Sequence, residues 1–284
     1  MTPRPAIIVF ADVDGILRHA DARAFSDAAN ALQGLRRDHI PLVLCSGKTR
    51  AEIEAIHQEL QINHPFVCEH GGAAFIPAGY FGFDVPCARE VGGYHALEFG
   101  RPYVEVVQSL HRAADRLRID IVGFDDMSVE AVARECHVPL LQARLAKLRE
   151  YGERFRILDS SETTRLRLFR ALKTARLRCI AGERYHHTGA LVNNNAGVEL
   201  LRTLYQRARG AVFTVGLADA TAENHALQSV NHRVSVSDVT LASGSGVLAW
   251  AETIINVVQE LRVQQRRRAL TLVGGYDDDG GRAL

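Results

Sequence analysis

The sequence predicts an α/β fold with a doubly wound parallel sheet and a second α/β domain inserted into it. Strand-like and helix-like segments alternate through the first eighty residues and again after residue 190. Between these two stretches the rhythm changes, as expected of an insertion. Regular alternation indicates parallel strands joined by right-handed crossovers. A chain of 284 residues is long enough for two domains of this kind.

The first part of the core consists of short strands separated by amphipathic helices. Each strand is an apolar run that ends at turn residues, and each helix has apolar residues at three- and four-residue spacing. The second helix begins with a capping box, because Glu52 follows Thr49 by three positions. The predicted elements are strands at 7–10, 40–45 and 66–68 and helices at 25–37 and 49–60.

The inserted segment has its own supply of strands and helices, and the core pattern resumes after it. The segment contains predicted helices at 103–117, 139–151 and 162–175 and strands at 154–158 and 177–181. The core then continues with a helix at 197–207, strands at 211–215 and 233–236 and a helix at 246–265. We therefore predict a core of 1–81 plus 191–265, an inserted domain of 82–190, and a disordered tail of 266–284, which is rich in Gly and Asp.

Composition argues against several classes of protein. Lys plus Arg (34) nearly balance Asp plus Glu (33), so no strong net field favours nucleic acid or a membrane surface. No apolar run has the length of a membrane span, and no signal peptide is recognisable. The five scattered cysteines are typical of reduced thiols in the cytoplasm. We expect a cytoplasmic protein whose partner is a small molecule, and the oligomeric state stays open.

Polar residues follow the predicted strands where ligands bind in doubly wound, Rossmann-like sheets, beyond the carboxyl ends. Asp12 and Asp14 leave the first strand, Ser46 and Gly47 the second, and Asp219 a late one. An Asp carboxylate can act as a covalent nucleophile towards phosphorus, and Mg²⁺ takes oxygen ligands. A Ser hydroxyl and neighbouring backbone N–H groups can hold a phosphoryl oxygen. A simple Asp-Gly turn is the alternative interpretation of the first pair.

Several motifs resemble a known family. Residues 10–15 (FADVDG) resemble the first motif of the haloacid dehalogenase-like phosphatases. Residues 40–50 (IPLVLCSGKTR), 64–73 (HPFVCEHGGA) and 75–81 (FIPAGYF) resemble one branch of them, the mannosyl-3-phosphoglycerate phosphatases. Weaker similarity extends over most of residues 6–260. The resemblance implies that the inserted domain is a cap that closes over the substrate.

The resemblance also implies a role for each matching residue. Asp12 would be the nucleophile that becomes an aspartyl-phosphate, and Asp14 would protonate the leaving sugar oxygen and then activate water. Arg184 would bind a carboxylate, because Arg makes bidentate contacts with such groups. The implied substrate-binding residues are Ser46, Gly47, Lys48, Arg184 and His186, and the implied Mg²⁺ ligands are Asp12, Asp14, Asp219 and Glu223.

The chain departs from the family pattern at four places. Ile16 replaces a Thr, His70 replaces an Asn, the Asn of the late metal segment is absent from 218–223, and 193–196 lacks the family's Lys before Gly197. Losing one positioned electrostatic group typically slows an enzyme by ~10²–10³. Two hypotheses follow: a Mg²⁺-dependent phosphatase of a sugar phosphoglycerate with low activity, or a catalytically degenerate relative that acts as a ligand-binding or regulatory protein.

Overall fold

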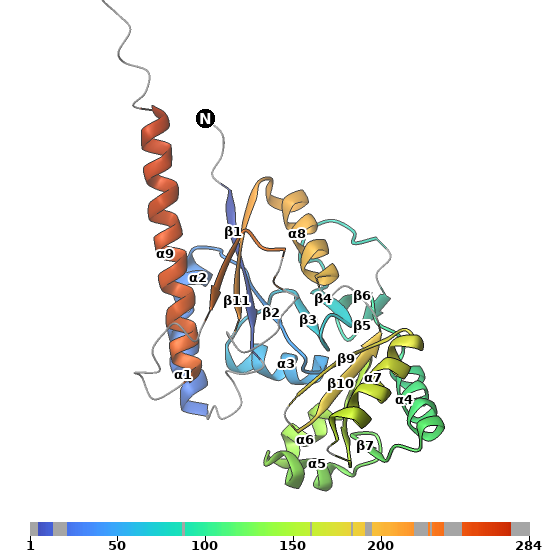
Figure 1. Ribbon diagram of the computed structural model, residues 1–284. Helices are drawn as coiled ribbons and strands as arrows, with labels where there is room; N and C mark the ends of the chain where they lie inside the picture. Colours follow the sequence, from blue (N-terminus) through green and yellow to red (C-terminus); the bar gives the residue numbers. More distant parts are fainter. Residues whose placement is uncertain are drawn as a thin grey trace, which may run out of the picture.

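The protein contains two sheets with helices packed on both. The computed structural model describes residues 5–13, 22–86, 89–159, 161–182, 184–190, 195–218, 227, 229–235 and 246–273. The strands within these ranges form one sheet of eight strands and one of four. In Figure 1 the smaller sheet lies at the lower right, beneath one end of the larger sheet. The predicted α/β fold, with a parallel core and an inserted cap, is confirmed.

The larger sheet is parallel in its central part. β1 (Ala6–Asp12) lies between β2 (Leu42–Cys45) and β11 (Val212–Ala218), and both run in its direction. β3 (Phe66–Cys68) and β12 (His232–Ser235) extend the parallel part on the two sides. Beyond β3 follow three antiparallel strands, in the order β4 (Ala73–Pro77), β6 (Tyr94–Glu98) and β5 (Arg89–Val91).

Helices cover both faces of this sheet, as Figure 1 shows. Successive side chains of a strand point to opposite faces. Val9 therefore packs in one core with the fully buried Trp250, and Phe10 packs in a second core with Leu201. This double burial explains why β1 is apolar up to Ala11, the residue before Asp12. The helices are α1 (Ala22–Ala31), α2 (Gln33–Arg37), α3 (Arg50–Glu59) and α9 (Gly246–Val273) on the first face and α8 (Ala196–Arg209) on the second.

The cap is built on the smaller, antiparallel sheet. One face of that sheet is covered by two helices, and Phe155 is fully buried there with Leu110 and Leu168. Two further helices pack on each other around Phe124 and Val132. The strand order is β7 (Ile121–Gly123), β8 (Gly152–Ile157), β10 (His186–Ala190) and β9 (Leu177–Ile180). The covering helices are α4 (Tyr103–Leu117) and α7 (Glu162–Thr174), and the further pair is α5 (Val129–Cys136) and α6 (Leu140–Ala146).

Three local predictions need correction. The helix predicted at 139–151 ends at Ala146, because the following residues turn back to contact the core. The segment predicted to begin the cap at residue 82 first adds β5 and β6 to the larger sheet, since β6 pairs with β4. The tail predicted from residue 266 starts as helix, because α9 continues to Val273; residues 274–284 lie outside the described residues.

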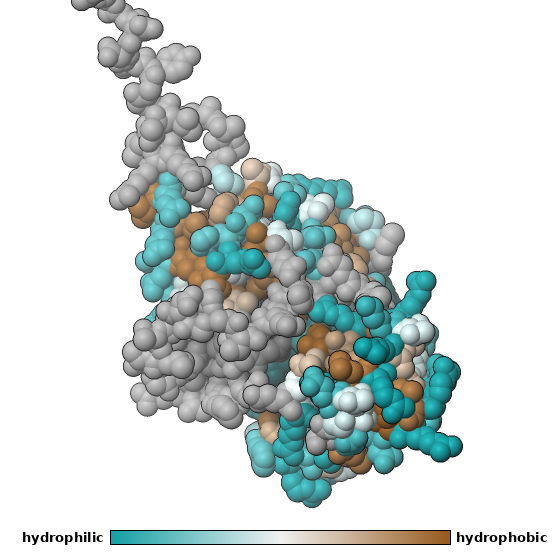
Figure 2. All heavy atoms as spheres, viewed as in Figure 1, coloured by the Kyte–Doolittle hydropathy of each residue, from teal (hydrophilic) through white to brown (hydrophobic). Residues whose placement is uncertain are grey.

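The surface of the cap mixes residue types. On the face seen in Figure 2, hydrophilic and hydrophobic residues are interspersed over the cap.

Within the described ranges, no helix combines the length and the apolar character that crossing a membrane requires.

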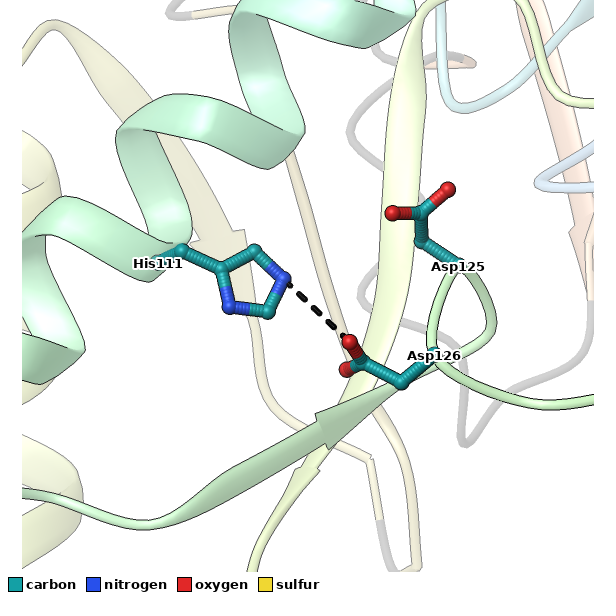
Figure 3. A group of neighbouring side chains, drawn as sticks. All are labelled: His111, Asp125 and Asp126. Atoms are coloured by element: carbon teal, nitrogen blue, oxygen red, sulfur yellow. Dashed lines mark ion pairs between the residues drawn. The ribbon is translucent and has the colours of Figure 1, made fainter.

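One group of metal-ligand side chains lies in the cap, away from the strand ends of the core. His111 of α4 faces Asp126 in the turn after β7, with Nε2 and Oδ1 3.7 Å apart, and Asp125 lies beside them (Figure 3). The other Asp126 oxygen accepts a 2.8 Å hydrogen bond from Gly123 N and so closes the turn. Both carboxylates are exposed to water. We interpret the group as a surface ion pair, which stabilises a fold by at most about 1 kcal/mol.

Candidate active site

β1, β2 and β3 end at the same edge of the larger sheet. Asp12 pairs with Cys45 across β1 and β2, and Cys45 pairs with Val67 across β2 and β3. Ser46 N donates to Val67 O at 3.0 Å, and His70 N donates to Ser46 O at 3.0 Å. The loop after β2 is therefore bonded to the loop after β3, directly beside the end of β1.

Asp12 and Ser46 are both buried at this edge. Their exposed fractions are 3% and 6%, unusual for polar residues at the end of a strand. The Ser46 hydroxyl accepts a 3.0 Å hydrogen bond from Lys48 N, which orders the loop around Gly47. The structure thus brings together the first carboxylate and the Ser-Gly loop that the sequence singled out.

The predicted metal site is described only in part. Asp12 offers a buried carboxylate oxygen, the donor type that Mg²⁺ prefers. Asp14, Asp219 and Glu223 lie outside the described residues. β11 ends at Ala218, one residue after Leu217, which pairs with Ala11 of β1. Asp219 follows in the sequence a strand whose end lies next to that of β1, and the shared ion site of the two carboxylates stays a prediction.

Lys48 lies at the start of α3 and is already paired. Lys48 Nζ lies 3.5 Å from Glu52 Oε1. Arg50 Nη1 lies 2.9 Å from Glu54 Oε1, and Arg50 Nε lies 2.8 Å from Glu150 Oε1 of the cap segment. These cations therefore lie along the junction between core and cap and balance acidic groups there.

Arg184 and His186, predicted to bind substrate, both contact other residues of the cap. Arg184 is 53% exposed, and its Nη2 lies 2.7 Å from Glu135 Oε2 at the surface of α5. The His186 ring contacts Phe155 and Phe169, with centroids 5.6 and 5.2 Å away, on the helix-covered face of the cap sheet. Neighbouring residues of a strand face opposite ways, so His187 points to the core instead.

His187, the neighbour of His186, was not assigned to the site from the sequence. It is 7% exposed, and its ring centroid lies 4.4 Å from that of His70 in the core. Burial, followed by the positive charges of His70, Arg149, Arg154 and Arg178, lowers the pKa of His187 well below its usual value. A neutral imidazole therefore lies among cationic cap residues opposite the Ser46 loop. The adjacent histidines were visible in the sequence, but the face towards the core was not.

His70 occupies the space beside Gly47. A Cβ atom at Gly47 would lie 2.2 Å from His70 Nε2, so only glycine fits there without moving the ring. Glu69 and His70 both have positive φ, 47° and 54°, and this sharp turn directs the ring back over the loop. The His that replaces the family's Asn thus lies against the predicted phosphate loop. A small cavity of about 20 Å³, enough for one water molecule, is lined by His70, His187 and Arg178.

A buried ion pair joins the loop after β3 to the cap. Arg149 Nη2 lies 3.4 Å from Glu69 Oε2, and the two side chains are 1% and 0% exposed. The Glu69 carboxylate also accepts backbone N–H groups of Glu150, Tyr151 and Gly152 at 2.8, 3.1 and 2.8 Å. Burial raises the pKa of Glu69, and Arg149 and the three donors oppose that rise. Arg149 also donates to Gly47 O at 3.3 Å, so one guanidinium links both loops to the cap.

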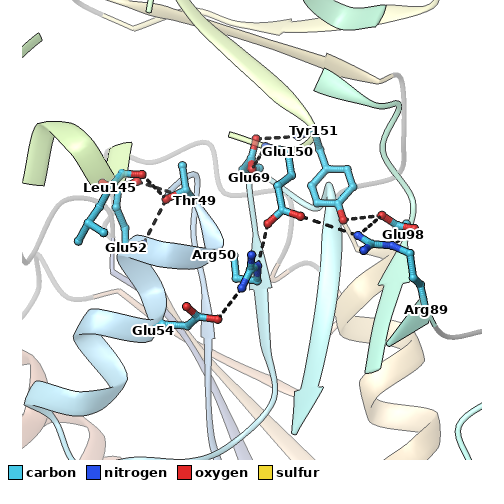
Figure 4. Close-up of polar contacts among 10 residues, drawn as sticks. All are labelled: Thr49, Arg50, Glu52, Glu54, Glu69, Arg89, Glu98, Leu145, Glu150 and Tyr151. Atoms are coloured by element: carbon cyan, nitrogen blue, oxygen red, sulfur yellow. Dashed lines mark hydrogen bonds and ion pairs between the residues drawn. The ribbon is translucent and has the colours of Figure 1, made fainter. Parts of the chain in front are cut away.

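Further polar contacts near this ion pair also link the core to the cap, as Figure 4 shows. The capping box predicted for α3 is confirmed: Thr49 Oγ1 accepts from Glu52 N, and Glu52 Oε2 accepts from Thr49 N. The Thr49 hydroxyl in turn donates to Leu145 O of the cap at 2.9 Å. The Tyr151 hydroxyl donates to Glu98 at 2.7 Å. The cap is therefore held to the core on the side where the loops converge.

Comparison with known proteins shows the family of the chain. The model of the haloacid dehalogenase-like hydrolase family matches residues 9–79, which include Asp12, Ser46 and Glu69. A glucosyl-3-phosphoglycerate/mannosyl-3-phosphoglycerate phosphatase of Methanococcoides burtonii is 31% identical over 264 residues, 88% of this chain and 97% of the relative. The chain belongs to the mannosyl-3-phosphoglycerate phosphatase family of haloacid dehalogenase-like hydrolases.

A second relative and two solved structures also match most of this chain. A phosphatase of the same name from Persephonella marina is 30% identical over 268 residues, 90% of this chain and 98% of the relative. A haloacid dehalogenase-like hydrolase from Bacteroides thetaiotaomicron superposes with a TM-score of 0.53 at 13% identity, covering 88% of this chain and 99% of its own. The crystal structure of the protein Thermoplasma acidophilum 0175 also superposes with a TM-score of 0.53, at 15% identity, and the match covers 80% of this chain and 84% of that protein. The two structures support the fold, and the relatives place the chain among phosphoric monoester hydrolases.

Proposed function

We propose that the protein is a Mg²⁺-dependent phosphatase that hydrolyses a sugar phosphoglycerate, such as mannosyl-3-phosphoglycerate, through an aspartyl-phosphate on Asp12. The observation that carries the proposal is the meeting of buried Asp12 with the Ser46-Gly47 loop beneath the cap. The names of the relatives support the same substrate class.

Charge on the cap side supports an anionic substrate. His187 faces the core, and the positive charges of Arg149, Arg154 and Arg178 act on it. Arg154 pairs directly with His187 across β8 and β10, so the two residues share a face of the cap sheet. A phosphoglycerate carries a phosphate and a carboxylate, and Arg binds both kinds of group. We propose that Arg154 and Arg178, rather than Arg184, supply positive charge opposite Asp12.

The proposed reaction uses groups of this chain in two displacements. An Asp12 oxygen attacks phosphorus, the bond from phosphorus to the glycerate oxygen breaks, and that oxygen takes a proton from Asp14. Asp14 then accepts a proton from water, whose oxygen attacks phosphorus and releases phosphate and the Asp12 carboxylate. The Ser46 hydroxyl and the N–H groups of its loop hold the phosphoryl oxygens throughout.

Asp12 fits a role in holding Mg²⁺, because a buried carboxylate is the donor type that this ion takes. Asp14, Asp219 and Glu223 stay the predicted partners. The bound ion would supply positive charge to the phosphoryl oxygens. The chain has no Lys at 193–196, where the family has one before Gly197. Its three lysines make other contacts: Lys48 pairs with Glu52, Lys147 donates to cap carbonyls, and Lys173 lies exposed on α7.

The direct test is phosphate release from mannosyl-3-phosphoglycerate and from its glucosyl counterpart in the presence of Mg²⁺. We expect release by the parent protein and none by Asp12→Asn, because an amide is a poor nucleophile towards phosphorus. Asp38→Asn is the matched control, since Asp38 pairs with Arg262 at the surface. Equal release by the parent and Asp12→Asn would overturn the proposal. Binding of the intact substrate in calorimetry without release would instead support the ligand-binding alternative.

Gly47→Ala is expected to lower kcat/KM by about 10²-fold, because its methyl group must displace the His70 ring and shift the Ser46 loop. The measurement is phosphate release from the substrate that the first test identifies. Adding His70→Ala should restore much of the lost rate, since it empties the space that the methyl group needs. Gly34→Ala is the control, because its nearest neighbour would be Ile255 Cδ1 at 3.8 Å. An equally slow double variant would contradict the explanation.

A further inference from the structure

A larger cavity lies at the opposite edge of the core, where β1, β2 and β3 begin. Its volume is about 410 Å³, within the range of small-molecule sites. It is bordered by Arg36 of α2, His64 ahead of β3, Tyr80 after β4, and Tyr205 and Arg209 of α8. Since the predicted catalytic residues follow the other ends of the same strands, the cavity is separate from the candidate active site.

One wall of the cavity is aromatic and held rigidly. Tyr80 and Phe81 contact each other edge to face at 5.0 Å, and both contact the buried Tyr205, at 6.1 and 5.0 Å. The Tyr80 hydroxyl is hydrogen-bonded to Tyr205 at 3.0 Å and to His64 Nδ1 at 2.8 Å. Burial, followed by the charge of Arg209, lowers the pKa of His64 to about 4, so this ring is neutral at pH 7. Such a wall suits a flat apolar group.

Two guanidinium groups border the same cavity, and neither has a counter-ion among the residues that the structure describes. Arg36 donates to Gln61 Oε1 at 3.1 Å and to Ala29 O at 2.7 Å. Arg209 donates to His39 O at 2.8 Å and lies over the Tyr205 ring at 5.8 Å. These are neutral acceptors, and among the described residues no carboxylate forms an ion pair with either Arg. Arg36 Nε is buried and, within the described part of the chain, has no hydrogen-bond partner.

We propose that this cavity is a second binding site, which takes a small organic anion with a flat apolar body, such as an aromatic carboxylate. The carboxylate would lie between Arg36 and Arg209 and use the bidentate geometry that guanidinium groups offer. The ring would pack against Tyr80, Phe81 and Tyr205. Both parts of the ligand are needed: the charge satisfies the cations, and the ring covers the aromatic wall.

Benzoate is the probe, titrated into the full chain and followed by ¹H–¹⁵N spectra that include the arginine Nε–H signals. We expect the Arg36 and Arg209 signals to shift together, with a dissociation constant of about 1–10 mM, as suits so small a ligand. Benzyl alcohol, which keeps the ring and lacks the charge, should bind at least about tenfold more weakly. No shift at either Arg, or shifts confined to the Ser46 loop, would overturn the proposal.

Variants locate the site. Arg209→Gln should weaken benzoate binding about tenfold or more. Arg207→Gln is the matched control, because Arg207 lies on the same helix but over the Phe83 ring at 4.1 Å. Ala208→Trp provides a second variant that fills the cavity from an exposed position and should also abolish binding while leaving the unfolding transition unchanged. Unchanged benzoate affinity in both Arg209→Gln and Ala208→Trp would refute the site. Loss of affinity in Arg207→Gln as large as in Arg209→Gln would refute it too.

Discussion

Replacing Arg149 by methionine is expected to lower the free energy of unfolding by about 3–5 kcal/mol, the cost typical of removing one partner from a buried ion pair. Glu69 would remain 0% exposed, with three backbone N–H donors but without its cation. Arg149 also donates to Gly47 O and Gly152 O, so its loss removes a hydrogen bond from each of these carbonyls. The junction between the cap and the Ser46 loop should weaken most.

Urea unfolding of a double-mutant cycle measures this effect. Glu69→Gln keeps an oxygen that accepts the N–H groups, and in combination with Arg149→Met it removes both charges. The double variant should therefore lose less stability than the two single variants lose together. Arg184→Met is the control, because its pair with Glu135 is half exposed and worth at most about 1 kcal/mol. A loss for Arg149→Met no larger than for Arg184→Met would contradict a buried pair at the junction.

Stability is expected to fall as the pH is lowered from 6.5 towards 4, because His57 and His64 are buried in their neutral form. Burial lowers the pKa of each to about 4 from the usual 6.5. Between these two values the unfolded chain binds protons that the folded chain does not, so each proton taken up favours unfolding. The contribution of each histidine to the free energy of unfolding is fully present above pH 6.5 and is lost below pH 4. This contribution is about 3 kcal/mol for each histidine.

His57→Phe tests the assignment to one residue. The His57 ring lies edge to face on Phe66 at 5.2 Å, and its Nε2 is buried with no hydrogen-bond partner among the described residues. A phenyl ring keeps the packing and cannot be protonated, so the variant should lose less stability than the parent as the pH falls. His232→Gln, at an exposed position of β12, should keep the parent's pH dependence. An unchanged pH dependence in His57→Phe would show that His57 does not carry the effect.

Local patterns in the sequence were sufficient to predict much of the secondary structure and topology of the core. The apolar runs before Asp12 and Ser46 predicted strands, and the alternation of strands with helices predicted that they run parallel. Parallel strands end at a common edge, so the meeting of these two residues followed from the pattern. The Thr49 capping box was equally readable, because both of its hydrogen bonds join residues three positions apart.

Contacts between residues far apart in the sequence could not be predicted from such local patterns. Glu69 and Arg149 are eighty positions apart, and no local pattern indicates that they share a buried site. The hairpin of β5 and β6 joins the larger sheet through β4, which a change of sequence rhythm could not distinguish from the start of the cap. Arg184 matched a motif, yet it lies between β9 and β10 and pairs at the surface with Glu135 of α5.

The sequence by itself determined the fold class, the family, and the edge of the sheet at which Asp12 and Ser46 lie, because strand and helix periodicity and short motifs are local properties. Only the tertiary structure decided which cap residues face that edge. The alternation of β10 separates His186 from His187 in any fold, but which of them meets the core depends on the face that α4 and α7 cover. That choice comes from packing between layers, which neighbouring residues do not encode.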